Sequence, residues 1–69
     1  MRLSIRNRLP GTVAEIDQGG VLSVVKVDLD GGQRVTASIT NDAVTDLGLA
    51  PGSKVTVLVK STEVSLAVE

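Results

Sequence analysis

The 69-residue chain contains no cysteine, no histidine and no aromatic residue. Without cysteine no disulfide can form, and without cysteine or histidine the common zinc ligands are missing. Nucleophilic catalysis is left with serine or threonine beside lysine, or with a pair of carboxylates. The chain also has no metal-ligand spacing and no phosphate-loop pattern. We therefore expect a protein that is not an enzyme.

The missing aromatic residues bear on stability and on nucleic-acid binding. A small chain whose largest core side chains are Leu, Ile and Met is marginally stable alone, so we expect a homo-oligomer. Barrels that bind single strands stack bases on aromatic side chains and carry a basic surface, whereas this chain has a net charge of −1. Nucleic-acid binding is therefore disfavoured, although Arg2, Arg6 and Arg8 cluster in the sequence and keep it open as an alternative.

Long apolar runs are also absent. No segment approaches the length of a membrane span, and we expect no charged-then-apolar leader before the domain. Hydrophobic residues make up 42% of the chain, which is typical of globular proteins. These features predict one domain over residues 1–69 that does not contact a membrane and is located in the cytoplasm.

The sequence does contain repeated alternation of apolar and polar residues, a pattern typical of half-buried β-strands. In the segment 21–29, Val21, Val25, Val27 and Leu29 are expected to share one face. The clearest alternation is that of Val35, Ala37 and Ile39 with polar neighbours. Strands are predicted at 3–6, 12–17, 21–29, 34–39, 55–60 and 64–68.

One segment predicts a short helix. Thr40 is expected to cap it, Asp42 lies near its positive end, and Gly48 is expected to end it. Val44 and Leu47 are expected on its inner side.

Two dipeptides predict tight turns. Asp30-Gly31 indicates a two-residue hairpin turn, and Pro51-Gly52 fits the central positions of a type II turn. Many short strands, one short helix and frequent turns together predict an all-β protein. The expected architecture is a small, closed or nearly closed β-barrel of the oligonucleotide/oligosaccharide-binding (OB-fold-like) type.

Two motifs near the ends of the chain place a cation among small polar residues: Ser4-Ile5-Arg6-Asn7, and Lys60-Ser61-Thr62. If they meet in space, they form a polar pocket with two positive charges, which suits a compact oxyanion. The alternative is two exposed cations that pair with Glu63 or Asp42 and contribute little energy. Periodicity alone favours that alternative.

Four motifs follow one another across nearly the whole chain, and together they resemble the Mop domain of molbindins, small cytoplasmic molybdate-binding proteins. The same domain forms the effector-binding part of molybdate-responsive regulators and the tail of molybdate importer ATPases. The motifs are Ser4-x-Arg6-Asn7-x-x-x-Gly11-x-Val13, Val35-Thr36-x-x-Ile39-Thr40, Leu47-Gly48-Leu49-x-x-Gly52-x-x-Val55 and Lys60-Ser61-Thr62-x-Val64.

The resemblance implies an OB-fold-like barrel assembled as a hexamer, a trimer of dimers, with oxyanions bound between subunits. It also implies a ligand set, in which Asn7 either binds the anion or braces the turn. At two positions the chain departs from the family. Ile5 replaces a frequent Ala and should affect packing only, and Ala43 replaces a frequent Ser, so one hydroxyl contact should be missing. The expected molybdate-binding residues are Ser4, Arg6, Asn7, Thr40, Lys60 and Ser61.

The function that follows from the resemblance is molybdate binding for storage or homeostasis in the cytoplasm, with tungstate as a close analogue. Two cations neutralise the doubly charged molybdate anion, and hydroxyl groups supply the remaining donors. A nearby carboxylate would repel the anion, so the distance of the Glu63 carboxylate from the site matters for binding. The alternative is an anion-sensing regulatory or protein-interaction module.

Overall fold

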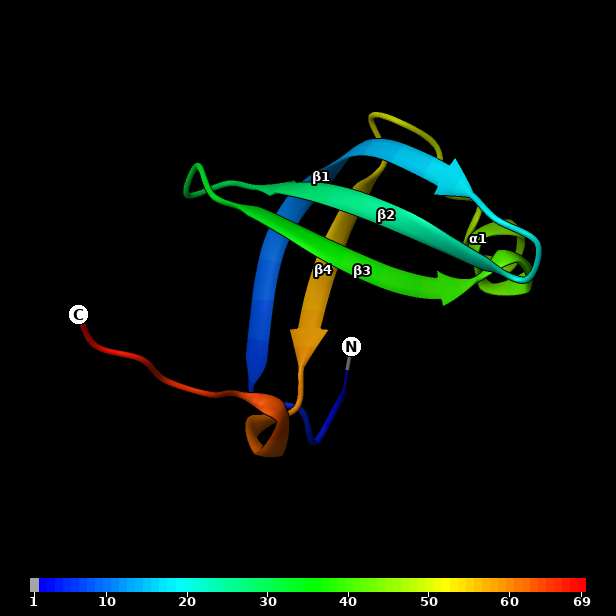
Figure 1. Cartoon of the computed structure of the whole chain (residues 1–69). Coiled ribbons are helices and arrows are strands. Elements are labelled where there is room, and N and C mark those ends of the chain that lie inside the picture. The colour runs from blue at the N-terminus through cyan, green and yellow to red at the C-terminus, as the bar shows by residue number, and fades with distance from the viewer. Residues whose placement is uncertain (1) are drawn as a thin grey trace.

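The computed structural model describes residues 2–69 as a curled four-stranded antiparallel sheet with one short helix (Figure 1). The predicted all-β class with a single helix is confirmed. In these residues no helix has the length and apolar character needed to cross a membrane. The strands run in the order β3-β2-β1-β4 in the sheet. The elements are β1 (Asn7–Gln18), β2 (Leu22–Leu29), β3 (Arg34–Thr40), α1 (Asn41–Leu47), β4 (Lys54–Val59) and the 3-10 turn η1 (Ser61–Glu63).

The long strand β1 joins the two halves of the sheet. Its residues 7–12 pair with β4, and its residues 11–18 pair with β2. The register shifts between Val13 and Glu15, which makes Ala14 a β-bulge, and a bulge bends its strand and increases the twist. As a result, β4 and the first half of β1 run across the β2–β3 hairpin (Figure 1).

Gly11 lies where β1 contacts both of its neighbours, opposite Leu29 of β2 and Val55 of β4. A Cβ atom built at this position would lie 2.7 Å from the Asp28 carbonyl oxygen and 2.8 Å from Val27 Cγ1. Real Cβ atoms do not approach other atoms so closely, so a side chain here would force the strands apart. The close approach of the backbones therefore requires glycine.

The fully enclosed apolar core is small. Val13, Val25 and Val27 are at most 3% exposed. Val25, Val27 and Leu29 share the inner face as predicted, but Val21 precedes β2 and is 74% exposed, so its predicted place on that face is wrong. Partly buried residues complete the inner face: Ile16, Leu29, Ile39, Val44, Leu49, Val55 and Val57.

A buried polar contact ties the helix to the sheet. Ser23 is 1% exposed, and its hydroxyl donates to Asn41 Oδ1 at the start of α1. The Asn41 amide nitrogen in turn donates to the carbonyls of Gly19 and Gly20. A buried hydroxyl is costly when it lacks a partner, so this network fixes α1 against the β1–β2 turn.

The helix begins and ends as predicted. Thr40 Oγ1 accepts the Ala43 N–H at 3.1 Å, and Gly48 adopts the left-handed conformation with φ of +62°. Val44 packs against the core. Leu47 also lies on the predicted inner side, where it lines an apolar hollow together with the core residues Val25 and Val27, but it remains 69% exposed.

One predicted turn has a different length and the other is confirmed. The β2–β3 hairpin closes through Gly32, whose φ is +99° and whose N–H donates to the Leu29 carbonyl. The predicted two-residue turn is wrong because Asp30 does not adopt the positive φ that a type I′ turn requires. At Pro51-Gly52, Gly52 has φ of +96° and the Ser53 N–H donates to the Ala50 carbonyl, as in a type II turn.

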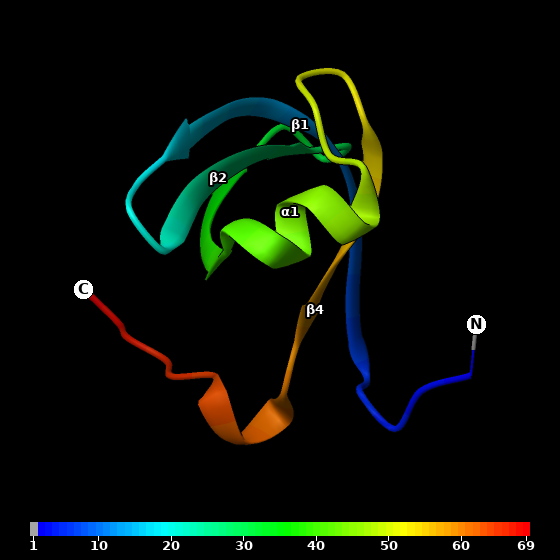
Figure 2. The ribbon, with the colours of Figure 1, turned by 90° about the vertical axis from the view of Figure 1, so that its right-hand side faces the viewer.

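The strands predicted at 3–6 and 64–68 are absent, and both segments leave the sheet at the end where β4 stops (Figure 2). Their alternation persists in part, because Leu3 and Ile5 are half-buried while Ser4 and Arg6 are exposed. Alternation becomes a strand only where a neighbouring strand supplies hydrogen-bond partners, and within one chain neither segment pairs with a strand.

Candidate functional site

The two cation-bearing motifs meet where β1 begins and β4 ends. Asn7 and Val59 form the last residue pair between these strands, and Asn7 Nδ2 donates to the Val59 carbonyl at 3.0 Å. Arg6 and Lys60 are the next residues beyond this pair. Antiparallel pairing of β1 with β4 thus joins segments from opposite ends of the sequence, and the two motifs do meet in space.

A surface hollow of about 190 Å³ lies at this junction. The side chains that line it include one ammonium group and three hydroxyl groups, and no carboxylate. Such a set of donors suits a small anion with several oxygen atoms. The lining residues are Ser4, Ile5, Lys60, Ser61 and Thr62.

The cations at this junction have no acidic partner among the residues that the structure describes. Among residues 2–69 the ion pairs belong to Arg34, which contacts Asp28 at 2.7 Å and Glu15 at 3.9 Å. The alternative that Arg6 and Lys60 pair with Glu63 or Asp42 is therefore not realised in this structure. Glu63 nevertheless lies close in the chain, since its N–H donates to the Lys60 carbonyl at 2.9 Å.

The Arg34 pair lies on the outer face of the sheet, where Asp28 and Arg34 oppose each other across β2 and β3. The hydrogen bond from Arg34 and its positive charge hold the pKa of Asp28 below its usual value. The same contact raises the pKa of Arg34. Because both side chains are about half exposed, the pair contributes little to stability.

Arg8 has a structural role that the sequence did not indicate. Its guanidinium donates to the Ile5 carbonyl at 3.1 Å and to the Leu3 carbonyl at 3.3 Å, and so holds the segment that carries Ser4. Although Arg8 is exposed, it is therefore more than a solvated charge. Arg8 lies two residues after Arg6, and nothing in the sequence distinguishes the roles of the two arginines. Ile5 and Thr62, which belong to the two motifs but not to the predicted ligand set, also line the hollow.

Thr40 lies far from this hollow in the structure. It pairs with Leu22 at the Gln18 end of β1, whereas the hollow lies at the Asn7 end. Its Oγ1 already accepts the Ala43 N–H, which leaves its own O–H free to donate. Of the six predicted residues, the structure brings Ser4, Lys60 and Ser61 into one hollow, places Arg6 and Asn7 beside it, and leaves Thr40 apart.

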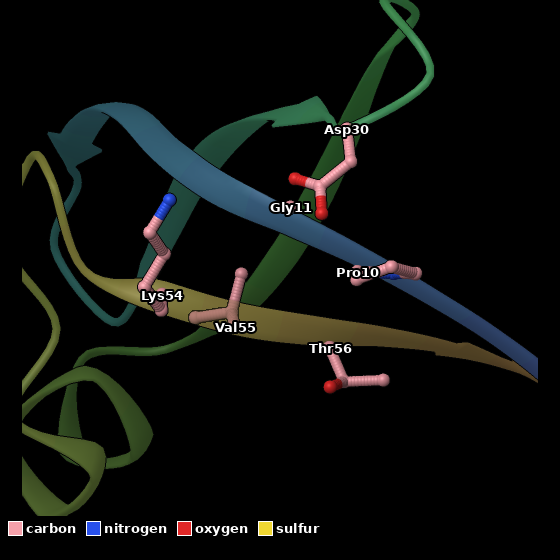
Figure 3. Close-up of a pocket in the computed structure, with 6 residues that line it drawn as sticks. All are labelled: Pro10, Gly11, Asp30, Lys54, Val55 and Thr56. Atoms are coloured by element: carbon pink, nitrogen blue, oxygen red, sulfur yellow. The ribbon is translucent and has the colours of Figure 1, made fainter.

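A second, larger hollow of about 310 Å³ lies on the outer face of β1 and β4 (Figure 3). Lys54 from β4 and Asp30 from the end of β2 flank Gly11 of β1 from its two sides. Lys54 Nζ donates to Thr12 Oγ1 at 3.0 Å. The Asp30 carboxylate would repel an anion, so the hollow at the chain ends is the better candidate for an oxyanion.

The chain matches the family model described as the TOBE domain over residues 3–66. It is 45% identical over 67 residues to the molybdenum transport protein ModE of Herbaspirillum seropedicae, covering 97% of this chain and 25% of ModE. It thus spans about a quarter of the length of ModE, as it does of MopB of Rhodobacter capsulatus. It is also 38% identical to molybdenum-pterin-binding protein 3 of Clostridium pasteurianum, covering 96% of this chain and 97% of that protein.

Solved structures show the same fold. A molybdate-binding protein from Sporomusa ovata matches with a TM-score of 0.92 and 46% identity, covering 97% of this chain and 98% of that one. The cytoplasmic molybdate-binding protein ModG, with molybdate bound, matches with a TM-score of 0.85 and 43% identity, covering 88% of this chain and 43% of ModG. The chain belongs to the TOBE-domain family, within the molybdenum-pterin-binding (Mop) proteins known as molbindins.

Proposed function

We propose that this chain binds molybdate at the hollow between the start of β1 and the end of β4, and that it stores or buffers the anion in the cytoplasm. The observation that carries the proposal is the junction itself. It gathers the Lys60 ammonium and the hydroxyls of Ser4 and Ser61, with Arg6 beside them and no carboxylate in the lining. The names of the relatives and of the solved structures support the same ligand.

The charges and donors of the junction fit the anion. Molybdate carries two negative charges, which Arg6 and Lys60 neutralise without excess. Charge-assisted hydrogen bonds contribute about 1.5–3 kcal/mol each, and a Kd of 1 μM corresponds to about −8.2 kcal/mol. A few such bonds therefore suffice for micromolar binding. Tungstate has the same charge and nearly the same size, so it competes for the same site.

We propose that the complete site forms between subunits. Thr40 belongs to the expected ligand set but lies at the opposite end of β1 from Lys60, so a Thr40 that contacts the anion comes from another copy. Asn7 braces β1 against β4 through Val59 and supports the site from beneath. The assembly in this proposal is a homo-oligomer, a hexamer built as a trimer of dimers. Its subunit contacts supplement a core with three fully buried apolar side chains.

Residues 1–69 act in this proposal as one binding domain without catalytic activity. The cytoplasmic location is supported by the description of ModG as a cytoplasmic molybdate-binding protein. It is also consistent with a chain free of cysteine.

Native mass spectrometry with and without molybdate tests anion binding and assembly together. We expect a hexamer that gains discrete molybdate masses, and calorimetric competition in which tungstate displaces molybdate while excess sulfate does not. Sulfate is smaller and leaves donors of a shaped site unpaired. A chain that gains no molybdate mass, or from which sulfate displaces molybdate readily, would contradict the proposal.

A further inference from the structure

The tip of the β2–β3 hairpin carries an Asp-Gly pair that the proposed anion site does not use. Asp30 and Gly31 lie between the end of β2 and the start of β3, and both are exposed. On one side of the pair, the Asp30 N–H donates to the Pro10 carbonyl at 3.0 Å. On the other side, the Gly32 N–H donates to the Leu29 carbonyl at 2.9 Å. The peptide bond that joins Asp30 to Gly31 thus lies between two anchored points.

The two groups of this pair that can react with each other have no partners. Among residues 2–69, no ion pair or hydrogen bond holds the Asp30 carboxylate, and no acceptor holds the Gly31 N–H. The Lys54 ammonium group, on the other side of Gly11, donates to Thr12 Oγ1 instead (Figure 3). A Cβ atom at Gly31 would have open space around it. Neither reacting group therefore has to give up a hydrogen bond before the two meet.

We propose that Asp30-Gly31 is a site of spontaneous backbone modification, at which Asp30 becomes isoaspartate through a succinimide. This inference is independent of molybdate binding. The Gly31 backbone nitrogen forms a bond to the Asp30 side-chain carboxyl carbon, and the carboxyl hydroxyl leaves with the amide proton as one water molecule. Water then adds to the ring and breaks the bond between the Gly31 nitrogen and the Asp30 main-chain carbonyl carbon. One water leaves and one returns, so the conversion needs no oxidant, reductant or cofactor.

Asp28, two residues earlier, has the same reacting group in a protected setting. Its carboxylate accepts hydrogen bonds from Arg34, and the next backbone N–H, that of Leu29, donates to the Gln33 carbonyl at 2.7 Å. The Leu29 side chain also crowds the nitrogen, whereas Gly31 has no side chain. The hairpin thus holds one aspartate against cyclisation and leaves the other able to react.

The product changes the turn itself. Isoaspartate places the Asp30 Cβ atom in the main chain, so the turn gains one backbone atom between the Leu29 carbonyl and the Gly32 N–H. The hydrogen bond that closes the hairpin tip depends on that spacing, and we expect it to be lost. Hydrogen exchange of the Gly32 amide should therefore be faster in the isoaspartyl form than in the fresh chain. Unchanged exchange would contradict a reacted turn.

Mass spectrometry of the aged full-length chain tests the proposal. The intact chain is incubated at neutral pH and physiological temperature and is then digested with trypsin. Cleavage after Lys26 and Arg34 yields a peptide of residues 27–34, in which Asp28 is an internal control for Asp30. Electron-transfer fragmentation distinguishes aspartate from isoaspartate at each position. We expect isoaspartate at Asp30 and not at Asp28, at a rate within about threefold of that in a synthetic peptide of the same residues, because a hairpin tip opens at little cost.

A matched pair of glycine variants provides the control. Gly31→Ala should lower the rate at Asp30 by about tenfold, because a methyl group hinders attack by the nitrogen. This variant should fold, since Gly31 has open space around it and does not adopt a positive φ. Gly20→Ala, at an equally open glycine in the β1–β2 turn, should leave the rate unchanged.

Three results would overturn the proposal. The first is a rate in the folded chain more than about tenfold below that of the synthetic peptide, which would show that the turn protects Asp30. The second is equal accumulation of isoaspartate at Asp28 and Asp30. The third is a Gly31→Ala variant that reacts as fast as the unmodified chain.

Discussion

The two ends of β1 differ in what they leave unsatisfied. At the Gln18 end, Val25 is buried, the Ser23 hydroxyl has its partner, and Asn41 closes the turn onto the helix. At the Asn7 end, Lys60 and Ser4 are exposed, and within residues 2–69 no acidic group pairs with the cations. One end folds through contacts of its own chain, and the other carries the groups that we propose bind the anion. Stability and recognition should therefore respond to different substitutions.

The largest effect is expected from removing both cations of the exposed end. Arg6→Ala with Lys60→Ala should weaken molybdate binding by about 3–6 kcal/mol, since each removal loses charge-assisted bonds of about 1.5–3 kcal/mol. The melting temperature without molybdate should stay the same or rise, because two like charges are removed. Calorimetric titration measures the loss. Arg2→Ala is the control, with a change below about 1 kcal/mol, and an equal loss there would indicate a diffuse basic surface.

A core substitution should produce the reverse pattern. Val27→Ala removes two methylene equivalents from a site that is 3% exposed and leaves a cavity, which lowers the free energy of unfolding by about 2 kcal/mol. Urea unfolding at a fixed subunit concentration measures this loss. The matched control Val21→Ala should change stability by less than about 0.5 kcal/mol. A Val27 variant that keeps its stability but loses molybdate affinity would abolish the distinction between the two ends.

Arg8 should show an intermediate effect. Arg8→Ala removes two hydrogen bonds that hold the Ser4 segment, so molybdate binding should weaken by about 1 kcal/mol, or roughly fivefold. Arg8→Lys should not restore it, because one ammonium group does not reproduce the two-pronged guanidinium contact. Calorimetric titration of Arg8→Ala and of Arg2→Ala with molybdate compares the loss of affinity for two arginines of equal charge. An Arg8 variant that binds like the Arg2 variant would show that the segment needs no such support.

The smallest effect concerns pH and the outer face of the sheet. The pKa of Asp28 is lowered in the folded chain, so its pairing with Arg34 stabilises the fold at neutral pH. That contribution is lost as pH falls below the ordinary carboxylate pKa of about 3.9 and through the lowered value. The melting temperatures of the unmodified chain and of Arg34→Gln should therefore converge between pH 5 and pH 2. A gap that widens in acid would contradict the assignment.

The sequence was sufficient where structure depends on neighbours in the chain. The alternation of Val35, Ala37 and Ile39 predicted β3, and Thr40 and Gly48 predicted both ends of α1. Local chemistry also located the turn at Gly52. Each of these features is fixed by backbone preference or by contacts within a few residues.

Features set by distant contacts could not be predicted in the same way. Alternation suggested strands at 3–6 and 64–68, but it does not show whether an edge is available to pair with them. The hairpin turn was assigned to Asp30-Gly31, whereas Gly32 adopts the positive φ. The contact of Arg8 with two carbonyls depends on how the N-terminal segment bends back, and two arginines in one run look alike in a sequence.

The close approach of β1 and β2 at Gly11 also limits which substitutions this sequence can accept. A Cβ atom at Gly20 or Gly31 would meet no atom beyond its chain neighbours within 4 Å, so we expect these positions to accept substitutions more readily. At Gly11 even the smallest side chain collides with the backbone of β2, so no gradual series of larger residues leads away from glycine. Selection for folding from a library randomised at Gly11, Gly20 and Gly31 should therefore return glycine at the first position and a broad mixture at the others.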